Sequence, residues 1–394
     1  MPSSNKAYWA FAALAPLALY LLFIGLAMIP FFQRHAIYAH RFHTLWWTDV
    51  DEPEKWGFAK NQVSALSLQT PDGVSLYAWH ILPLPVWAQH EDQLVKQPAV
   101  APEEFTKSEA FRLLREDPHS RLVLYFHGNA GHVTQGIRAA SYHVLTDTSS
   151  YHVIAIDYRG FGHSTGSPSE EGLITDASTV VDFAVNVAGV PPSRIVLLGQ
   201  SLGTAVTSAV AERYVARGVD FAGVVLVAGF SSLPTMLSGY AIAGYVPILR
   251  PLGIIPPLLD WVMGFIVDKW LSAERLASMV RAVKTRGGRL RLSLIHGADD
   301  PDIPCRESDK LFAAAVNATV DRGLDPQDLV EMKDVRTVWK GKKAFKTTWA
   351  APPDTVITHE QFPYGGHNDV MMYAPVTLAI MRSFGLEGTV YSQA

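Results

Sequence analysis

A serine lies between two glycines in the segment GQSLG at positions 199–203. This G-x-S-x-G pattern follows the apolar run 195–198 and precedes helix-forming residues that begin at Thr204. A serine in a sharp turn between a strand and a helix is exposed at the end of the strand, and the amino terminus of the helix places partial positive charge beside it. The glycines are needed because larger side chains would collide in so tight a turn. We therefore interpret Ser201 as a nucleophile.

A serine hydroxyl needs a base to take its proton and an acid to orient that base. The apolar run 290–295 leads into HGADDPDIP (296–304), which contains three aspartates, and spacing alone does not choose among them. A later run, 355–362, leads into PYGGHND, where His367 follows two glycines at a strand end and is the candidate base. Serine, aspartate and histidine then follow one another in the order that α/β-hydrolases have.

A third loop is a candidate for stabilising developing negative charge. The run 122–126 leads into HGNAG (127–131). Acyl transfer builds negative charge on the carbonyl oxygen, and each fixed backbone N–H that stabilises it lowers the barrier by roughly 2.7–4 kcal/mol. We expect one such N–H from Leu202, directly after the serine, and the other from Asn129. A tight glycine turn without a ligand role is the alternative interpretation of this loop.

The rest of the chain predicts a sheet that positions these loops. Short apolar runs fit buried strands at 122–126, 153–156, 195–198, 224–227 and 290–295. Because stretches with helical spacing separate most of them, we predict an α/β fold with a mostly parallel central sheet and helices on both faces. A hairpin, 64–68 and 74–79, precedes it. Ligands bind beyond the carboxyl ends of parallel strands, so the three loops are expected to meet at one edge.

The amino-terminal segment, 1–45, is predicted to hold a single transmembrane helix. From position 7 to position 32 the chain has no charged residue, and such a run is long enough to cross a bilayer core. A cleaved signal peptide, whose apolar core is usually about 7–15 residues long, and a buried soluble helix are the alternatives. Basic residues lie on both sides of the run and do not decide its orientation. The glycosylation sequon at Asn317 is usable only if the body, 46–394, faces a lumen.

A cap insertion is predicted at about 231–285, between the runs 224–227 and 290–295. Its first part, 231–265, has only Arg250 and Asp260 as charged residues, so we expect it to line an acyl pocket or to enter the membrane. A second membrane span is the rival interpretation, but prolines interrupt any continuous helix there.

Two further segments have no assigned role. Residues 83–120 are polar and are expected to carry one short amphipathic helix. The second segment, 321–354, contains WKGKKAFKTTW at 339–349, which mixes cations with aromatic residues. That stretch is interpreted either as a solvated hairpin or as a contact with anionic lipid headgroups.

Composition excludes several classes of protein. The 394 residues include 33 Lys and Arg against 37 Asp and Glu, for a net charge of −4, whereas a nucleic-acid binder needs a basic face. Hydrophobic residues make up 48% and charged residues 18%, so the chain is not disordered and is expected to bury a large core. The single cysteine, Cys305, excludes an internal disulfide and a zinc site of several cysteines.

Four motifs together carry a family resemblance: HGNAG (127–131), DYRGFGHSTGSPSEEG (157–172), GQSLG (199–203) and HGADDPDIP (296–304). They resemble the membrane-anchored serine lipases called alpha/beta-hydrolase-domain-containing protein twelve. The resemblance implies the α/β-hydrolase fold, one amino-terminal transmembrane helix in the endoplasmic reticulum, and hydrolysis of lysophospholipids or monoacylglycerols. The family pattern places the acid on Asp300 and the base on His367, although the Asn368-Asp369 pair after the histidine departs from it.

The predicted function is therefore a membrane-anchored serine hydrolase that cleaves lipid carboxylic esters through Ser201, His367 and Asp300. We expect no metal or organic cofactor, a lipid ester as substrate and the bilayer as partner, and no nucleic acid. One alternative is a palmitoyl-protein thioesterase, because HGNAG is shared with such enzymes. The other is a non-catalytic membrane scaffold that keeps the fold.

Overall fold

The computed structural model describes residues 3–98, 100–242 and 246–385. One sheet contains the strands β1 (Val63–Gln69), β2 (Ser75–Ile81), β3 (Arg121–Phe126), β4 (Tyr151–Ile156), β5 (Ile195–Gln200), β6 (Gly223–Val227), β9 (Arg289–Gly297), β10 (Thr337–Gly341), β11 (Ala344–Ala351) and β12 (Asp354–Phe362). Their order is β1-β2-β4-β3-β5-β6-β9-β12-β11-β10. The six strands from β4 to β12 pair in parallel, and antiparallel strands extend both edges. The predicted mostly parallel sheet is confirmed.

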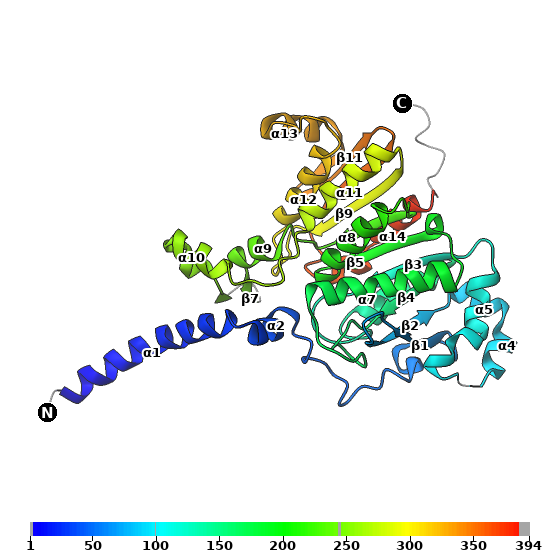
Figure 1. The fold of residues 1–394 in the computed structure, drawn as a ribbon, viewed down its shortest axis with the longest axis horizontal. Helices are drawn as coiled ribbons and strands as arrows, with labels where there is room; N and C mark the ends of the chain where they lie inside the picture. Colours follow the sequence, from blue (N-terminus) through cyan, green and yellow to red (C-terminus); the bar gives the residue numbers. More distant parts are fainter. Residues whose placement is uncertain (1–2, 99, 243–245, 386–394) are drawn as a thin grey trace.

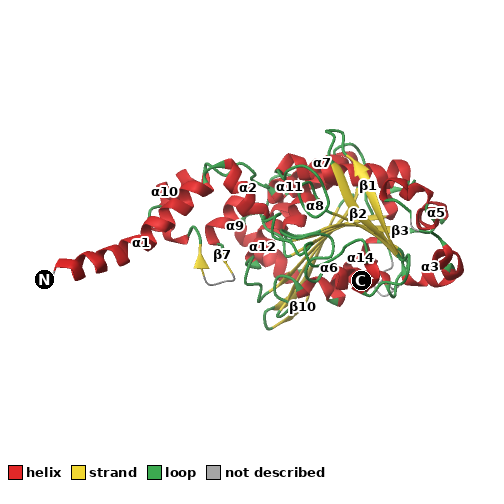
Figure 2. Ribbon diagram, turned by 90° about the horizontal axis from the view of Figure 1, so that it is seen from below, coloured by secondary structure: helices red, strands yellow, loops and turns green. Residues whose placement is uncertain are grey.

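Helices cover both faces of this sheet (Figures 1 and 2). Side chains alternate along each strand, so Leu122 and Leu124 of β3 pack into one core layer and Val123 and Tyr125 into the other. The first layer is closed by α7 (Glu170–Asp182), α8 (Leu202–Val215), α11 (Ser272–Arg286) and α12 (Arg306–Asn317). The second is closed by α6 (Arg138–Thr146) and α14 (Ala374–Ser383). The loops after β3, β5, β9 and β12 consequently meet at one edge.

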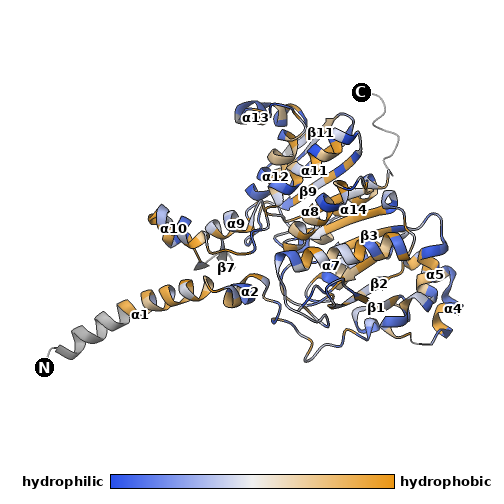
Figure 3. Cartoon of the chain, viewed as in Figure 1, coloured by the Kyte–Doolittle hydropathy of each residue, from blue (hydrophilic) through white to orange (hydrophobic). Residues whose placement is uncertain are grey.

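The amino-terminal segment forms two helices, α1 (Ser3–Ala27) and α2 (Pro30–Tyr38), where one span was predicted for 7–32. Pro30 begins α2, and the part of α1 from Leu14 to Ala27 makes an angle of 97° with that helix. Within the residues described, no one helix is long and apolar enough to cross a bilayer, whereas this bent pair together has the necessary length and composition. A single continuous transmembrane helix is therefore not confirmed. Figure 3 shows that the described residues of α1 are mostly apolar.

The residues after β6 form short elements beside α1 rather than a second long helix (Figure 1). They are α9 (Leu233–Gly239), the two-residue strands β7 (Ala241–Ile242) and β8 (Val246–Pro247), a 3-10 turn (Arg250–Ile254) and α10 (Pro256–Met263). Prolines stand in the first turn of both helices, where the missing N–H costs nothing. We call the stretch 231–270 the cap. The remainder of the predicted insertion lies in α11, which packs into the core layer of α8.

The two segments without an assigned role are more ordered than the sequence indicated. Instead of one short helix, 83–120 contains α3 (Leu84–Gln89), α4 (Glu91–Lys96), a 3-10 helix (Pro102–Lys107) and α5 (Glu109–Glu116). The other segment contains α13 (Pro326–Val335) and the β10–β11 hairpin, which adds two strands to the sheet. Trp349 of β11 is buried and donates to the hydroxyl of Thr319, so one face of the hairpin is packed rather than solvated. Asn317, in the sequon, accepts a hydrogen bond from the backbone N–H of Leu324.

Candidate active site

Ser201 lies in a strained turn between β5 and α8. Its φ of 54° is in the left-handed region, which non-glycine residues rarely adopt. A Cβ at Gly199 would lie 2.3 Å from the carbonyl oxygen of Gly203, and a Cβ at Gly203 would lie 1.9 Å from that of Phe126. Both positions therefore require glycine, and the turn holds the serine at the amino terminus of α8, where the helix dipole favours negative charge.

His367 lies between Ser201 and an aspartate. Its Nε2 is 2.8 Å from the Oγ of Ser201, and its Nδ1 is 2.8 Å from the Oδ2 of Asp300. The loop that carries the imidazole is held on two sides, because Asp299 accepts from the backbone N–H of Gly366 at 2.8 Å and the Gln200 side chain donates to the carbonyl of His367 at 3.1 Å. The structure thus brings together the serine, the histidine and one of the three aspartates.

Asp300 is held as a carboxylate. Its Oδ1 accepts from the backbone N–H groups of Asp302 and Ile303, each at 2.8 Å. Burial raises the pKa of Asp300, but hydrogen bonds from His296 and His367 lower it by more. The net effect places the pKa of this carboxyl well below its usual range. The ionised Oδ2 accepts a hydrogen bond from the N–H at Nδ1 of His367, so the proton stays on Nδ1 and Nε2 is free to accept from the serine hydroxyl.

The two neighbouring acids have other positions. Asp299 holds the histidine loop through Gly366, and Asp302 lines the cavity described below. Asp300, Asp302 and His367 offer ligand atoms within 4.8 Å of one another, so these three side chains are a possible cation site. A cation bound to either ring nitrogen would displace a 2.8 Å hydrogen bond of His367, either to Ser201 or to Asp300.

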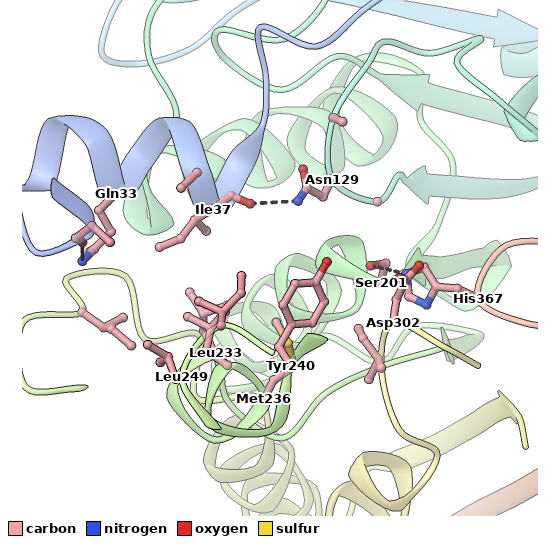
Figure 4. A pocket seen from close by; sticks show the side chains of 18 of the residues that line it. Gln33, Ile37, Asn129, Ser201, Leu233, Met236, Tyr240, Leu249, Asp302 and His367 are labelled. Carbon is pink, nitrogen blue, oxygen red and sulfur yellow. Dashed lines mark hydrogen bonds between the residues drawn. The ribbon is translucent and has the colours of Figure 1, made fainter. Parts of the chain in front are cut away.

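The HGNAG loop lies across the cavity from the cap (Figure 4). The Asn129 side chain donates to the carbonyl of Ile37 at 2.9 Å, and the next N–H, of Ala130, donates to the carbonyl of Tyr38 at 3.1 Å. Among the hydrogen bonds of the described residues, none uses the backbone N–H of Asn129 or of Leu202. Both amides predicted for the oxyanion therefore keep their donor capacity.

Arg138 supports this loop and was not predicted from the sequence. The side chain is buried, and its guanidinium donates to the carbonyl of His132 at 2.6 Å and to those of Gly128, Asn129 and Ala130 at 3.0, 2.9 and 2.8 Å. Four carbonyls pointing inward leave the N–H groups of the loop free to point elsewhere. An arginine at the start of a helix carries no motif that would have identified it.

Replacing Arg138 by lysine is expected to lower kcat by up to about 10²-fold, the lower end of the range for losing one oxyanion donor, with little change in KM. A lysine ammonium is a point charge and cannot replace the planar fork that reaches four carbonyls. Steady-state kinetics of the wild type and the Arg138→Lys variant measure this effect. A wild-type kcat in a folded variant would show that the loop does not depend on the guanidinium.

Asp157, directly after β4, supports the same region. Its carboxylate accepts from the backbone N–H of Val133 at 2.7 Å and of His163 at 3.3 Å. Burial raises the pKa of this fully buried carboxyl to about 7, against the lowering effects of the two N–H groups and of the Arg138 charge. The role is structural, because the side chain lies behind the loop and does not line the cavity.

A stability dependence on pH follows from Asp157. The folded-state pKa of about 7 exceeds the value of about 3.9 expected in the unfolded chain, so the folded protein retains a proton that the unfolded chain releases. The resulting stabilisation is complete below about pH 4 and is lost as the pH rises through about 7. Between about pH 5 and pH 8, the wild-type Tm is expected to fall relative to that of Asp157→Asn. A Tm difference that stays constant across a series of thermal unfolding measurements contradicts this assignment.

A cavity of about 520 Å³ opens beside Ser201. Its walls come from the HGNAG loop, the cap and the amino-terminal helices, and Figure 4 labels Gln33, Ile37, Asn129, Leu233, Met236, Tyr240, Leu249 and Asp302 among the side chains that line it. Cavities of this size hold small organic ligands, and a mainly apolar lining with a few polar groups is typical of them. Ser201 and His367 lie at one end of this row of side chains.

Comparisons with known proteins agree with the geometry. The sequence family described as "alpha/beta hydrolase fold" matches residues 121–242. Human "Protein ABHD12B" is 33% identical over 197 residues, 50% of each chain, and "Lysophosphatidylserine lipase ABHD12" of Macaca fascicularis is 28% identical over 296 residues, 74% of this chain and 65% of that one. The matches thus span between half and two thirds of these curated relatives. The crystal structure of an alpha-beta hydrolase from Vibrio vulnificus shares the fold, with a TM-score of 0.56 and 17% identity over 90% of this chain and 94% of that one.

Proposed function

Since the chain is an α/β hydrolase related to the ABHD12 proteins, as its motifs predicted, we propose that it is a serine hydrolase that cleaves carboxylic esters of lipids. The observation that carries the proposal is the pair of 2.8 Å contacts that His367 makes, one to Ser201 and one to Asp300. A base within hydrogen-bonding reach of a hydroxyl, oriented by a carboxylate, is what activates a serine.

In the proposed reaction, Ser201 Oγ attacks the ester carbonyl while Nε2 of His367 takes the hydroxyl proton. The carbonyl oxygen becomes negative and accepts hydrogen bonds from the N–H groups of Asn129 and Leu202. His367 then gives its proton to the departing alcohol, and the acyl group stays on the serine. Water, activated by the same imidazole, releases the acid and restores the hydroxyl. Asp300 stabilises the imidazolium in both halves of the cycle.

The proposed substrate class is lysophospholipids or monoacylglycerols. The cavity has an apolar cap wall, which favours an acyl chain over a polar substrate. Two relatives are named lysophosphatidylserine lipases, and lysophosphatidylserine is one ester of this class.

Turnover of a defined panel of acyl compounds tests the proposal. The purified protein in detergent is offered lysophospholipids with different headgroups, a monoacylglycerol and a palmitoylated cysteine peptide. We expect hydrolysis of oxygen esters. Hydrolysis of the thioester alone would favour the protein thioesterase, and a folded protein that hydrolyses none of them would favour the scaffold.

We further propose that α1 and α2 bind the chain to a membrane. Large apolar side chains on α1 are exposed to an extent that water disfavours: Leu14, Leu17, Leu19, Leu21 and Leu22. A helix of this kind is stable when a bilayer covers it. The protein is expected to stay with membranes in alkaline carbonate and to enter solution only with detergent. Release by carbonate alone would contradict the anchor.

A further inference from the structure

The amino-terminal helices contribute directly to the cavity beside Ser201. From α1 the lining residues are Phe23, Ile24 and Ala27, from the bend Met28, and from α2 they are Gln33, Ala36 and Ile37. A segment that only tethered the chain to a membrane would not need to line the cavity beside Ser201, yet seven of its residues do so. Contacts with the cap and with the HGNAG loop hold these helices in place.

Gln33 joins the bend between the helices to the cap. This buried side chain donates to the carbonyls of Ala27 and Phe265, at 3.0 and 3.1 Å, and accepts from the backbone N–H of Val267 at 2.8 Å. One amide thus makes three hydrogen bonds, two of them to the end of the cap. Breaking them would leave buried polar groups without partners, which is costly.

A second contact lies farther along α1. Ile24 is buried in an apolar cluster with Leu249, Leu252 and Val262 of the cap. One turn before it, the Tyr20 hydroxyl donates to the carbonyl of Ile248 at 2.8 Å. The helix therefore lies against the cap through packing as well as hydrogen bonds, and the cavity passes between them.

At its other end, α2 is attached to the HGNAG loop. The carbonyls of Ile37 and Tyr38 accept from Asn129 and Ala130, as described above. The Tyr38 hydroxyl also donates to Asp268 at 2.7 Å and accepts from the Trp270 indole at 3.2 Å. The position of the helix pair relative to the reacting serine is thus set from both sides.

The chemistry of the lining changes along the cavity. Its charged members are Arg138, which supports the HGNAG loop, and Asp302, which lies in the loop after β9. The residues from α1 are all uncharged and apolar. Figure 4 shows Ser201 and His367 at one end of the labelled row and Gln33 at the other. An ester carbonyl fits the first end, and a hydrocarbon chain fits the second.

We propose that the α1–α2 pair is one wall of the acyl-chain site, which begins at Ser201, passes between α2 and the cap, and ends against α1 near Ala27. The inference rests on the proposed ester hydrolysis and adds a specificity determinant to it. The small side chains Ala27 and Ala36 leave the space that the distal part of a long acyl chain occupies. Bulk at either position shortens the chain that the enzyme accepts.

The test compares an oleoyl ester with a butyryl ester of the same alcohol. In Ala27→Trp and, separately, in Ala36→Trp, the ratio of kcat/KM for the oleoyl ester to that for the butyryl ester is expected to fall about tenfold or more, as it would if two or more methylene groups lost their burial. Because Ala36 is exposed on α2, a larger side chain at this position does not overpack the protein core.

Ala18→Trp is the matched control. Ala18 is exposed, does not line the cavity, and lies about 180° around α1 from Ala27. The ratio is expected to stay at its wild-type value in this variant. A wild-type ratio in both alanine variants, or an equal fall in the control, would overturn the inference while butyryl turnover still supports the hydrolase. A wild type that hydrolyses neither ester would overturn the proposed function and this inference with it.

Discussion

Replacing Ser201 by alanine is expected to lower kcat for a lysophospholipid or monoacylglycerol by about 10⁶-fold, to the level set by binding and the oxyanion donors alone. The variant keeps the turn but loses the only atom that can form the acyl-enzyme. The imidazole of His367, 2.8 Å from Oγ in the wild type, then has no hydroxyl to activate. Release of fatty acid under saturating substrate measures the change.

Ser208→Ala is the matched control for that variant. Ser208 is also buried on α8, but its hydroxyl donates to the carbonyl of Thr204 within the helix and does not line the cavity. We expect near wild-type turnover from this control. Substantial turnover by folded Ser201→Ala would assign the reaction to another group.

Replacing Asp300 by asparagine is expected to lower kcat by about 10⁴-fold. The carboxylate is what fixes the proton on Nδ1 of His367, 2.8 Å away, and so keeps Nε2 available to the serine. An asparagine that turns its N–H₂ toward the ring would favour the opposite tautomer, in which Nε2 carries the proton and is no base. The pKa of Asp300 lies below its usual range, so the wild type is not expected to lose activity by protonation of this group near neutral pH.

Asp299→Asn provides the comparison at the adjacent position. The new side chain still has an oxygen that accepts from the backbone N–H of Gly366, as Asp299 does at 2.8 Å. Its effect on kcat is expected to be small. Equal losses in the two variants would mean that the loop needs its total charge rather than one oriented carboxylate.

The positions of the central strands were predictable from the sequence, because buried parallel strands are short apolar runs that stand out from their neighbours. The run 195–198 becomes part of β5 (Ile195–Gln200), and 290–295 becomes part of β9 (Arg289–Gly297). The motifs that follow such strands meet at one edge in any parallel sheet. Fold class therefore follows from the pattern of residues without knowledge of side-chain contacts.

The choice among the aspartates was not available from spacing. Three carboxylates within four positions are equivalent along the sequence, and only the family resemblance favoured Asp300. In the structure the three side chains point in different directions. Asp300 contacts His367, Asp299 contacts Gly366, and Asp302 faces the cavity. Direction depends on the turn after β9, which a linear pattern does not describe.

The role of the amino-terminal helices was also beyond the sequence. A long apolar run predicts burial in lipid, and nothing in its composition distinguishes residues such as Ile24, which pack on a cap more than 200 positions later. Gln33 gave no signal either, because its hydrogen-bond partners are all backbone groups. Arg138 was missed for the same reason, because its four acceptors are backbone carbonyls.

The most direct test of the central claim is to map the covalent adduct formed when the folded 394-residue chain reacts with a fluorophosphonate. Such a probe traps a serine only where a base has activated it. We predict one adduct, on the peptide that contains Ser201, and none after prior replacement of His367 by alanine. An adduct on a different residue, or unaltered labelling in the His367 variant, would contradict the account.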